Sequence, residues 1–133
     1  MFYMKQKTKS ANVGIVGEDT ACRYLENKGF SIKCRNYRQK WGEIDIIGYK
    51  SGITHFIEVK TVSRNLSVAR ETLGNYRPED NVHTWKIQRL SRTIQTYMFS
   101  KKIEGNWQFD VITVYLDLDN KMAKVEMMEN LVL

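Results

Sequence analysis

The sequence has few of the residues that define several classes of protein. Among 133 residues it has 1 Pro and 8 Gly, too few for a collagen-like or low-complexity chain. Its 2 Cys, Cys22 and Cys34, form no CxxC pair, and the 2 His complete no zinc-site spacing. A cytosolic protein rarely keeps a disulfide, so we interpret both cysteines as small buried apolar side chains.

Long apolar segments are missing as well. The longest, at 111–116, is far shorter than the ~20 residues that a membrane-spanning helix needs. The start of the chain is rich in Lys but has no apolar stretch of the kind found in signal peptides. We therefore expect a soluble, cytoplasmic protein with no membrane partner.

Positive charge is in excess. There are 21 Lys and Arg against 15 Asp and Glu, which gives a formal net charge of +6. A small basic domain suits a polyanion such as nucleic acid, because clustered cations displace the counterions condensed on phosphates. The chain has no repeat and no linker-like tract, so we expect a single domain over 1–133. Its first part, 1–12, is expected to be a flexible basic N-terminus.

Seven segments have the periodicity of helices or strands. Helices are expected at 13–28, where Gly29 provides a stop signal, and at 81–100, after the acidic start Pro78-Glu79-Asp80. Strands are expected at 30–35, 42–49, 53–61, 107–116 and 121–128. Between them, 62–79 has no sustained period and is expected to be a long mobile loop. The order α-β-β-β-α-β-β predicts an α/β fold, a mixed sheet flanked by helices.

One carboxylate conflicts with the apolar pattern of the first helix. On a helical wheel, Glu18 falls inside the stripe formed by Ala21, Cys22 and Leu25. Local conflicts of this kind tend to mark functional positions. Glu18 is therefore a candidate site residue.

More carboxylates occur on the strands GEIDIIGY (42–49) and ITHFIEVKT (53–61). Alternation places Glu43 and Asp45 on one face of the first strand, and Glu58 and Lys60 on one face of the second. A hairpin would bring Asp45 and Glu58 together, and such a pair favours Mg²⁺ or Mn²⁺ as its counter-ion. Lys60 could then orient a water molecule or neutralise charge on a phosphate. The alternative is a surface hairpin whose charges only keep an edge strand soluble.

Several blocks in register resemble a known family, the YraN-like proteins of bacteria. That family is similar to the archaeal Holliday junction resolvases, within the PD-(D/E)xK or restriction-endonuclease-like superfamily. The blocks are GEDTACRYLENKGFSIKCRNYR, WGEIDIIG, HFIEVKTVS, PEDNVHTWKIQRL and FDVITV. The position that is Pro in the superfamily motif is Ile44 here.

The resemblance implies a restriction-endonuclease-like fold with a metal-dependent phosphodiesterase core. By position, Asp45 and Glu58 would be the metal carboxylates, Lys60 the catalytic lysine, and Glu18 a further catalytic and metal-binding carboxylate from the helix. Glu43 and Lys86 lie in the same blocks and would be accessory residues.

Basic side chains interleaved with the aromatic residues Tyr37 and Trp41 suit contacts to phosphates and bases. The candidate nucleic-acid-binding residues are Lys33, Arg35, Arg38, Lys40, Arg64, Lys86 and Arg89. For Arg89, an ordinary solvated helix face is the alternative. Lys86 could contact a phosphate or pair with Glu18.

We therefore expect a Mg²⁺- or Mn²⁺-dependent endonuclease that acts on DNA rather than RNA, including branched or damaged DNA. A nucleic-acid-binding module with a silent or partner-activated nuclease core is the first alternative, and a protein–protein adaptor that uses the 62–79 loop is the second. The two-fold symmetry of resolvase substrates also suggests a homodimer. His55 and His83 have no Ser or Cys partner for nucleophilic catalysis, and Asp110 is expected to form structural hydrogen bonds.

Overall fold

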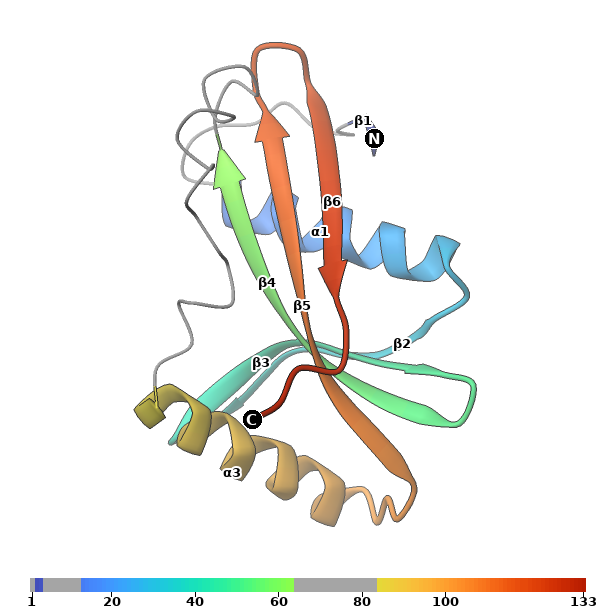
Figure 1. The fold of residues 1–133 in the computed structure, drawn as a ribbon, viewed down its shortest axis with the longest axis vertical. Coiled ribbons are helices and arrows are strands. Elements are labelled where there is room, and N and C mark those ends of the chain that lie inside the picture. The colour runs from blue at the N-terminus through green and yellow to red at the C-terminus, as the bar shows by residue number, and fades with distance from the viewer. Residues whose placement is uncertain (1, 4–12, 64–83) are drawn as a thin grey trace.

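Helices cover both faces of a mixed sheet in the computed structural model, which describes residues 2–3, 13–63 and 84–133 (Figure 1). The helices are α1 (Val13–Asn27) and α3 (Thr84–Ser100). The strands are β1 (Phe2–Tyr3), β2 (Ser31–Gln39), β3 (Gly42–Lys50), β4 (Ile53–Ser63), β5 (Asn106–Asp117) and β6 (Met122–Met128). From α1 to β6, this order confirms the predicted α-β-β-β-α-β-β arrangement. Among the described residues, no helix has the length and apolar character needed to span a membrane.

The six strands follow the spatial order β1-β6-β5-β4-β3-β2. The central pair β4–β5 is parallel, and the other neighbours are antiparallel. The two-residue strand β1 was not predicted, because it falls in the segment 1–12 that was expected to be flexible. Phe2 and Tyr3 pair with Ala123 and Met122, so the backbone groups at the edge of β6 gain hydrogen-bond partners there.

The boundary of the predicted loop at 62–79 was wrong at its start. Parallel pairing with β5 continues through Val62 and Ser63, opposite Tyr115 and Leu116, so β4 extends to Ser63. The remainder of that loop, and the predicted helix start at 78–83, lie outside the described residues. Strand β2 is also longer than predicted, because pairing with β3 continues to Gln39.

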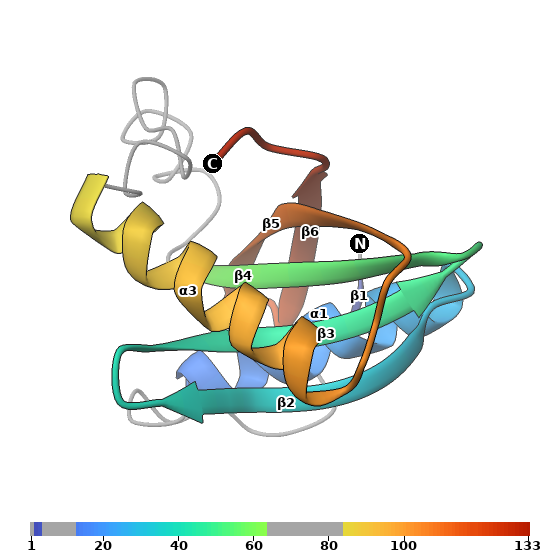
Figure 2. The same ribbon diagram turned by 90° about the horizontal axis from the view of Figure 1, so that it is seen from below.

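Each face of the sheet packs against one helix (Figure 2). Leu25 of α1 packs on Ile46, Ile57 and Ile112, whereas Ile94 of α3 belongs to the cluster on the other face. Helix α1 ends as its sequence predicts. Gly29 adopts a left-handed φ of 93°, and the Phe30 N–H donates to the Leu25 carbonyl at 3.0 Å.

Candidate functional site

The alternation of side chains changes face where Asn36 of β2 is opposite Asp45 of β3. Ile44 and Ile47 are three positions apart, yet both belong to the α3-side core, whereas Ile46 belongs to the α1-side core. Asn36 has a left-handed φ of 54°, which reverses the direction of successive side chains on β2. The strict alternation assumed from the sequence therefore fails at Asp45, the residue that matters most for the site.

Strands β3 and β4 separate at this same position. Their pairing runs from Lys50 opposite Ile53 to Ile46 opposite Ile57, and it stops one step before Asp45 and Glu58. Figure 1 shows the two strands side by side near their common turn and then diverging. Beyond the last pair, Asp45 Oδ2 accepts a hydrogen bond from the Val59 N–H at 2.8 Å. The Asp45 carboxylate thus accepts a hydrogen bond from β4 where the backbone of β3 no longer pairs with that strand.

The separation of β3 from β4 opens a cleft of about 270 Å³. Asp45, Glu58 and Glu43 line it together with Trp41 and Arg89. The structure thus brings the two predicted metal carboxylates into one cavity, with the predicted accessory carboxylate Glu43 and one predicted nucleic-acid contact, Arg89.

Helix α1 carries Glu18 toward this region because it approaches β4 unusually closely. A Cβ atom on Gly17 would lie 1.9 Å from Thr61 Oγ1, so only glycine allows this contact. The next residue, Glu18, is mostly buried, with 23% of its side chain exposed. Its charge acts on Asp45, and Arg35 lies 3.8 Å from it.

Asp45 is a perturbed carboxyl group. Burial is the largest cause and raises its pKa from 3.8 to about 6. The hydrogen bond from Val59 opposes this shift, while the negative charges of Glu18, Glu58 and Glu43 add to it. Such an electrostatic environment favours either a proton or a metal cation at Asp45.

The donor set fits a hard divalent cation. Asp45 and Glu58 offer carboxylate oxygens, and Mg²⁺ is commonly held by one or two carboxylates with water completing its coordination. Glu18 acts on Asp45 through its charge. However, within residues 13–63 and 84–133, the group of three potential ligands whose atoms lie within 4.8 Å of one another is His55, Asp110 and Glu129. The three carboxylates Glu18, Asp45 and Glu58 do not lie this close together. Glu18 would therefore act on a cation through a water molecule or by its charge.

The structure disperses the predicted basic residues. Arg35 forms an ion pair with Asp19 at 2.8 Å, and Lys33 stacks on Tyr49 away from the cleft. Arg38 pairs with Glu43 at 3.1 Å on the exposed surface. Lys40, in the β2–β3 turn, and Lys60, on β4, are exposed. Arg64 and the side chain of Lys86 lie outside the described part of the chain.

Trp41, predicted as an aromatic residue for nucleic-acid contact, lies against Arg92 of α3. The Arg92 guanidinium lies 3.9 Å from the centroid of the Trp41 ring, an arrangement typical of a cation–π interaction. Trp41 Nε1 is buried and has no hydrogen-bond partner in the described structure, although the residue lines the cleft. The pairing of Trp41 with Arg92 is a tertiary contact that the local sequence pattern did not predict.

Comparison with known proteins identifies relatives of unknown activity. The sequence model of the uncharacterised protein family UPF0102 matches residues 17–114. A UPF0102 protein of Campylobacter lari is 43% identical over 104 residues, which are 78% of this chain and 84% of the relative. A UPF0102 protein of Campylobacter hominis is 34% identical over 123 residues, or 92% of this chain and 96% of the relative. The predicted resemblance to the YraN-like proteins is thereby confirmed at the level of the family.

Proposed function

Since the chain belongs to the uncharacterised protein family UPF0102, whose description states no activity, we propose from its acidic cleft that it is a Mg²⁺-dependent endonuclease acting on DNA. The observation that carries the proposal is the divergence of β3 from β4, which places Asp45 and Glu58 in one cleft. The raised pKa of Asp45, a buried carboxyl group in a cleft with other carboxylates, is of the kind found at functional sites and supports the proposal. Mn²⁺ could replace Mg²⁺ at the same oxygen ligands.

Each residue has a defined task in this proposal. Asp45 and Glu58 hold the cation, and the Val59 N–H fixes the orientation of the Asp45 carboxylate. Bound Mg²⁺ supplies Lewis-acid polarisation of a phosphate oxygen and lowers the pKa of its water ligands. Lys60, exposed on β4, neutralises charge that builds on the phosphate or orients the attacking water. Glu18 adds negative charge from α1 and strengthens cation binding.

Nucleic acid would approach across the β2–β3 turn and α3. Arg89 lines the cleft, Lys40 is exposed in the turn, and Trp41 with Arg92 offers an aromatic and cationic surface beside the carboxylates. Bases that are not stacked in a duplex can stack on such a surface. This arrangement suits DNA with unpaired bases, such as branched or damaged DNA.

A cleavage assay with the full chain tests the proposal. Single-stranded, duplex, flapped and four-way-junction DNA, and RNA of the same sequence, are incubated with Mg²⁺, Mn²⁺ or EDTA. Glu58→Gln removes a cation ligand, while Glu126→Gln, an exposed carboxylate on β6, is the matched control. Fluorescence anisotropy without metal measures binding of the same substrates.

We expect metal-dependent cutting that Glu58→Gln reduces by about a hundredfold or more and that Glu126→Gln preserves. Binding should change little in either variant, because Glu58 contributes no positive charge. Cleavage that survives Glu58→Gln, or that persists in EDTA, would overturn the assignment.

The second candidate is a nucleic-acid-binding module whose nuclease core is silent alone or is activated by a partner. The stacked Trp41–Arg92 pair favours it, because this surface does not depend on the carboxylates. Salt-sensitive binding of DNA without cleavage in any metal would support this candidate over the first. We also propose that the protein acts in the cytoplasm as a homodimer.

A further inference from the structure

A second cluster of ligand-type side chains lies on the α1 side of the sheet, apart from the acidic cleft. His55 of β4 and Asp110 of β5 are buried, with 5% and 0% of their surfaces exposed. His55 Nδ1 and Asp110 Oδ2 are 2.6 Å apart, and the Phe30 ring packs against the imidazole edge. The predicted hydrogen-bonding role of Asp110 is confirmed.

The other oxygen of Asp110 is fixed by two donors. Gln108 Nε2 and the Asn130 N–H each donate to Asp110 Oδ1 at 2.8 Å. Asn130 has a left-handed φ of 56°, and the Leu131 N–H donates to the Phe109 carbonyl at 2.8 Å. These contacts hold the chain after β6 against β5, and they place Glu129 beside Asp110.

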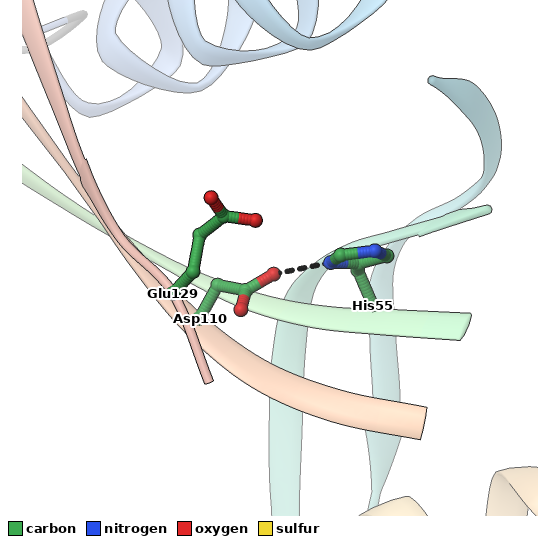
Figure 3. Close-up of side chains that lie close together, drawn as sticks. All are labelled: His55, Asp110 and Glu129. Atoms are coloured by element: carbon green, nitrogen blue, oxygen red, sulfur yellow. Dashed lines mark hydrogen bonds and ion pairs between the residues drawn. The ribbon is translucent and has the colours of Figure 1, made fainter. Parts of the chain in front are cut away.

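The result is a group of three potential ligands. One ligand atom from each of His55, Asp110 and Glu129 lies within 4.8 Å of the other two. Figure 3 shows both carboxylates on the side of the imidazole that carries Nδ1. In a tetrahedral Zn²⁺ site with bonds of about 2.0–2.2 Å, ligand atoms lie about 3.4 Å apart. A bound ion would therefore replace the 2.6 Å hydrogen bond between His55 Nδ1 and Asp110 Oδ2, with these two atoms moving apart and the Glu129 carboxylate moving closer.

We propose that His55, Asp110 and Glu129 form a second metal site, which takes a borderline divalent cation of the Zn²⁺ type. An imidazole nitrogen favours Zn²⁺ over Mg²⁺, whereas the all-oxygen cleft favours Mg²⁺. A structural hydrogen bond between His55 and Asp110 would not need a third ligand-type side chain beside it. The nearby Glu129 raises the negative charge of the cluster, and a divalent cation would balance the two carboxylates.

The exposed side of the site opens into a groove of about 390 Å³ that also contains Lys28 and Lys50. Their ammonium groups lie 5.6 Å from the Tyr24 ring and 5.1 Å from the Phe30 ring. These charges weaken cation binding. They also favour an anionic group as the outer ligand of a bound metal.

NMR spectroscopy of the imidazole nitrogens tests this proposal, because the chain has only 2 His. Zn²⁺ is titrated into ¹⁵N-labelled full-length protein carrying Asp45→Asn and Glu58→Gln, which removes the cleft as a binding site. The His83→Asn variant assigns the His55 signals. Glu129→Gln is the test variant, and Glu126→Gln, also exposed, is its matched control. Calorimetry measures the affinity and the number of ions bound.

We expect one Zn²⁺ per chain, a shift of the His55 Nδ1 signal, and no response to Mg²⁺. Glu129→Gln should weaken Zn²⁺ binding by about tenfold or more, while Glu126→Gln should not. Zn²⁺ binding that leaves the His55 signals unchanged, or no binding at all, would overturn the proposal. The outcome is independent of nuclease activity, since the cleft has been removed.

Discussion

Opposing interactions act on the protonation of the Asp45 carboxyl group. Its carboxylate accepts the Val59 N–H, which favours the charged form, but burial and three other carboxylates favour the neutral form. The pKa of Asp45 is therefore about 6, and the neutral form prevails below that pH. Below that pH a proton competes with any cation for Asp45, so we expect Mg²⁺ binding to weaken as the solution becomes more acidic.

Asp45→Asn is predicted to change how stability depends on pH. Because the folded-state pKa is raised from 3.8 to about 6, the folded protein binds more protons than the unfolded chain in that window. In the metal-free wild type, the contribution of Asp45 to stability therefore falls as pH rises from 3.8 to about 6, and the variant lacks this loss. At neutral pH the variant should be more stable by roughly 1–3 kcal/mol.

Urea unfolding in EDTA at several pH values measures this difference. The two proteins should have similar stability at the acidic end of the series. Added Mg²⁺ at neutral pH should stabilise the wild type more than the variant, because the amide offers no charge to the cation. A constant difference between the two proteins at all pH values would show that Asp45 is not perturbed.

Trp41 is predicted to contribute to DNA binding through its aromatic ring. Trp41→Ala removes the surface on which Arg92 lies and should weaken binding of single-stranded DNA by about tenfold. Trp41→Phe keeps an aromatic ring, so its effect should be smaller. Anisotropy with labelled DNA measures both variants. Equal affinity of Trp41→Ala and wild type would exclude this surface as a DNA contact.

At the scale of the elements, the packing of α1 on β4 decides where Glu18 lies. Gly17→Ala would place a methyl group 1.9 Å from Thr61 Oγ1 and should destabilise the protein by about 1–3 kcal/mol or more. Gly14→Ala, in the same helix with nothing within 4 Å, should instead be neutral or stabilising. Thermal unfolding compares them, and similar melting temperatures for the two variants would contradict the close packing.

Cleavage by Gly17→Ala should fall below that of Gly14→Ala under conditions where both variants are folded, because a displaced helix moves Glu18 away from Asp45. Gly17→Ala combined with Thr61→Ala should recover part of the stability, since the threonine hydroxyl and methyl groups are removed. Failure of this rescue would locate the strain elsewhere.

The sequence predicted most elements, because each has a clear period or stop signal. Helix α1 and its Gly29 terminus, the β3–β4 hairpin and the apolar strand β5 are examples. The sequence could not predict β1, whose two residues pair with the distant strand β6. Nor could it predict that β4 extends to Ser63, which depends on pairing with a distant strand.

The candidate site was predicted in composition but not in geometry. Asp45 and Glu58 share a cleft as expected, although the reason is a change of face opposite Asn36 and not regular alternation. Arg35 was assigned to nucleic acid but pairs with Asp19, a tertiary contact that no local pattern contains. The His55 cluster was also missed, because its three members lie on three separate segments.

At the scale of the whole molecule, the net charge of +6 predicts salt-dependent binding of nucleic acid. Affinity should fall by at least tenfold between about 50 and 200 mM salt. Arg89→Ala, in the cleft, should reduce the slope of log affinity against log salt by about one. Lys124→Ala, which removes an exposed cation paired with Glu126 on β6, is the control and should leave the slope unchanged. A salt-independent affinity would favour the adaptor hypothesis over both nucleic-acid functions.

The parallel pairing of β4 with β5 has a consequence for biosynthesis. When β4 leaves the ribosome, only its first half has a partner in β3, whose pairing ends at Ile57. The half that carries Glu58 and Lys60 pairs with Val111 and Thr113, which are translated much later. A nascent chain that has not yet exposed β5 thus has the acidic residues but no ordered strand to hold them. Interrupted translation would therefore leave a fragment without the cleft, so any activity would arise only after β5 has been made.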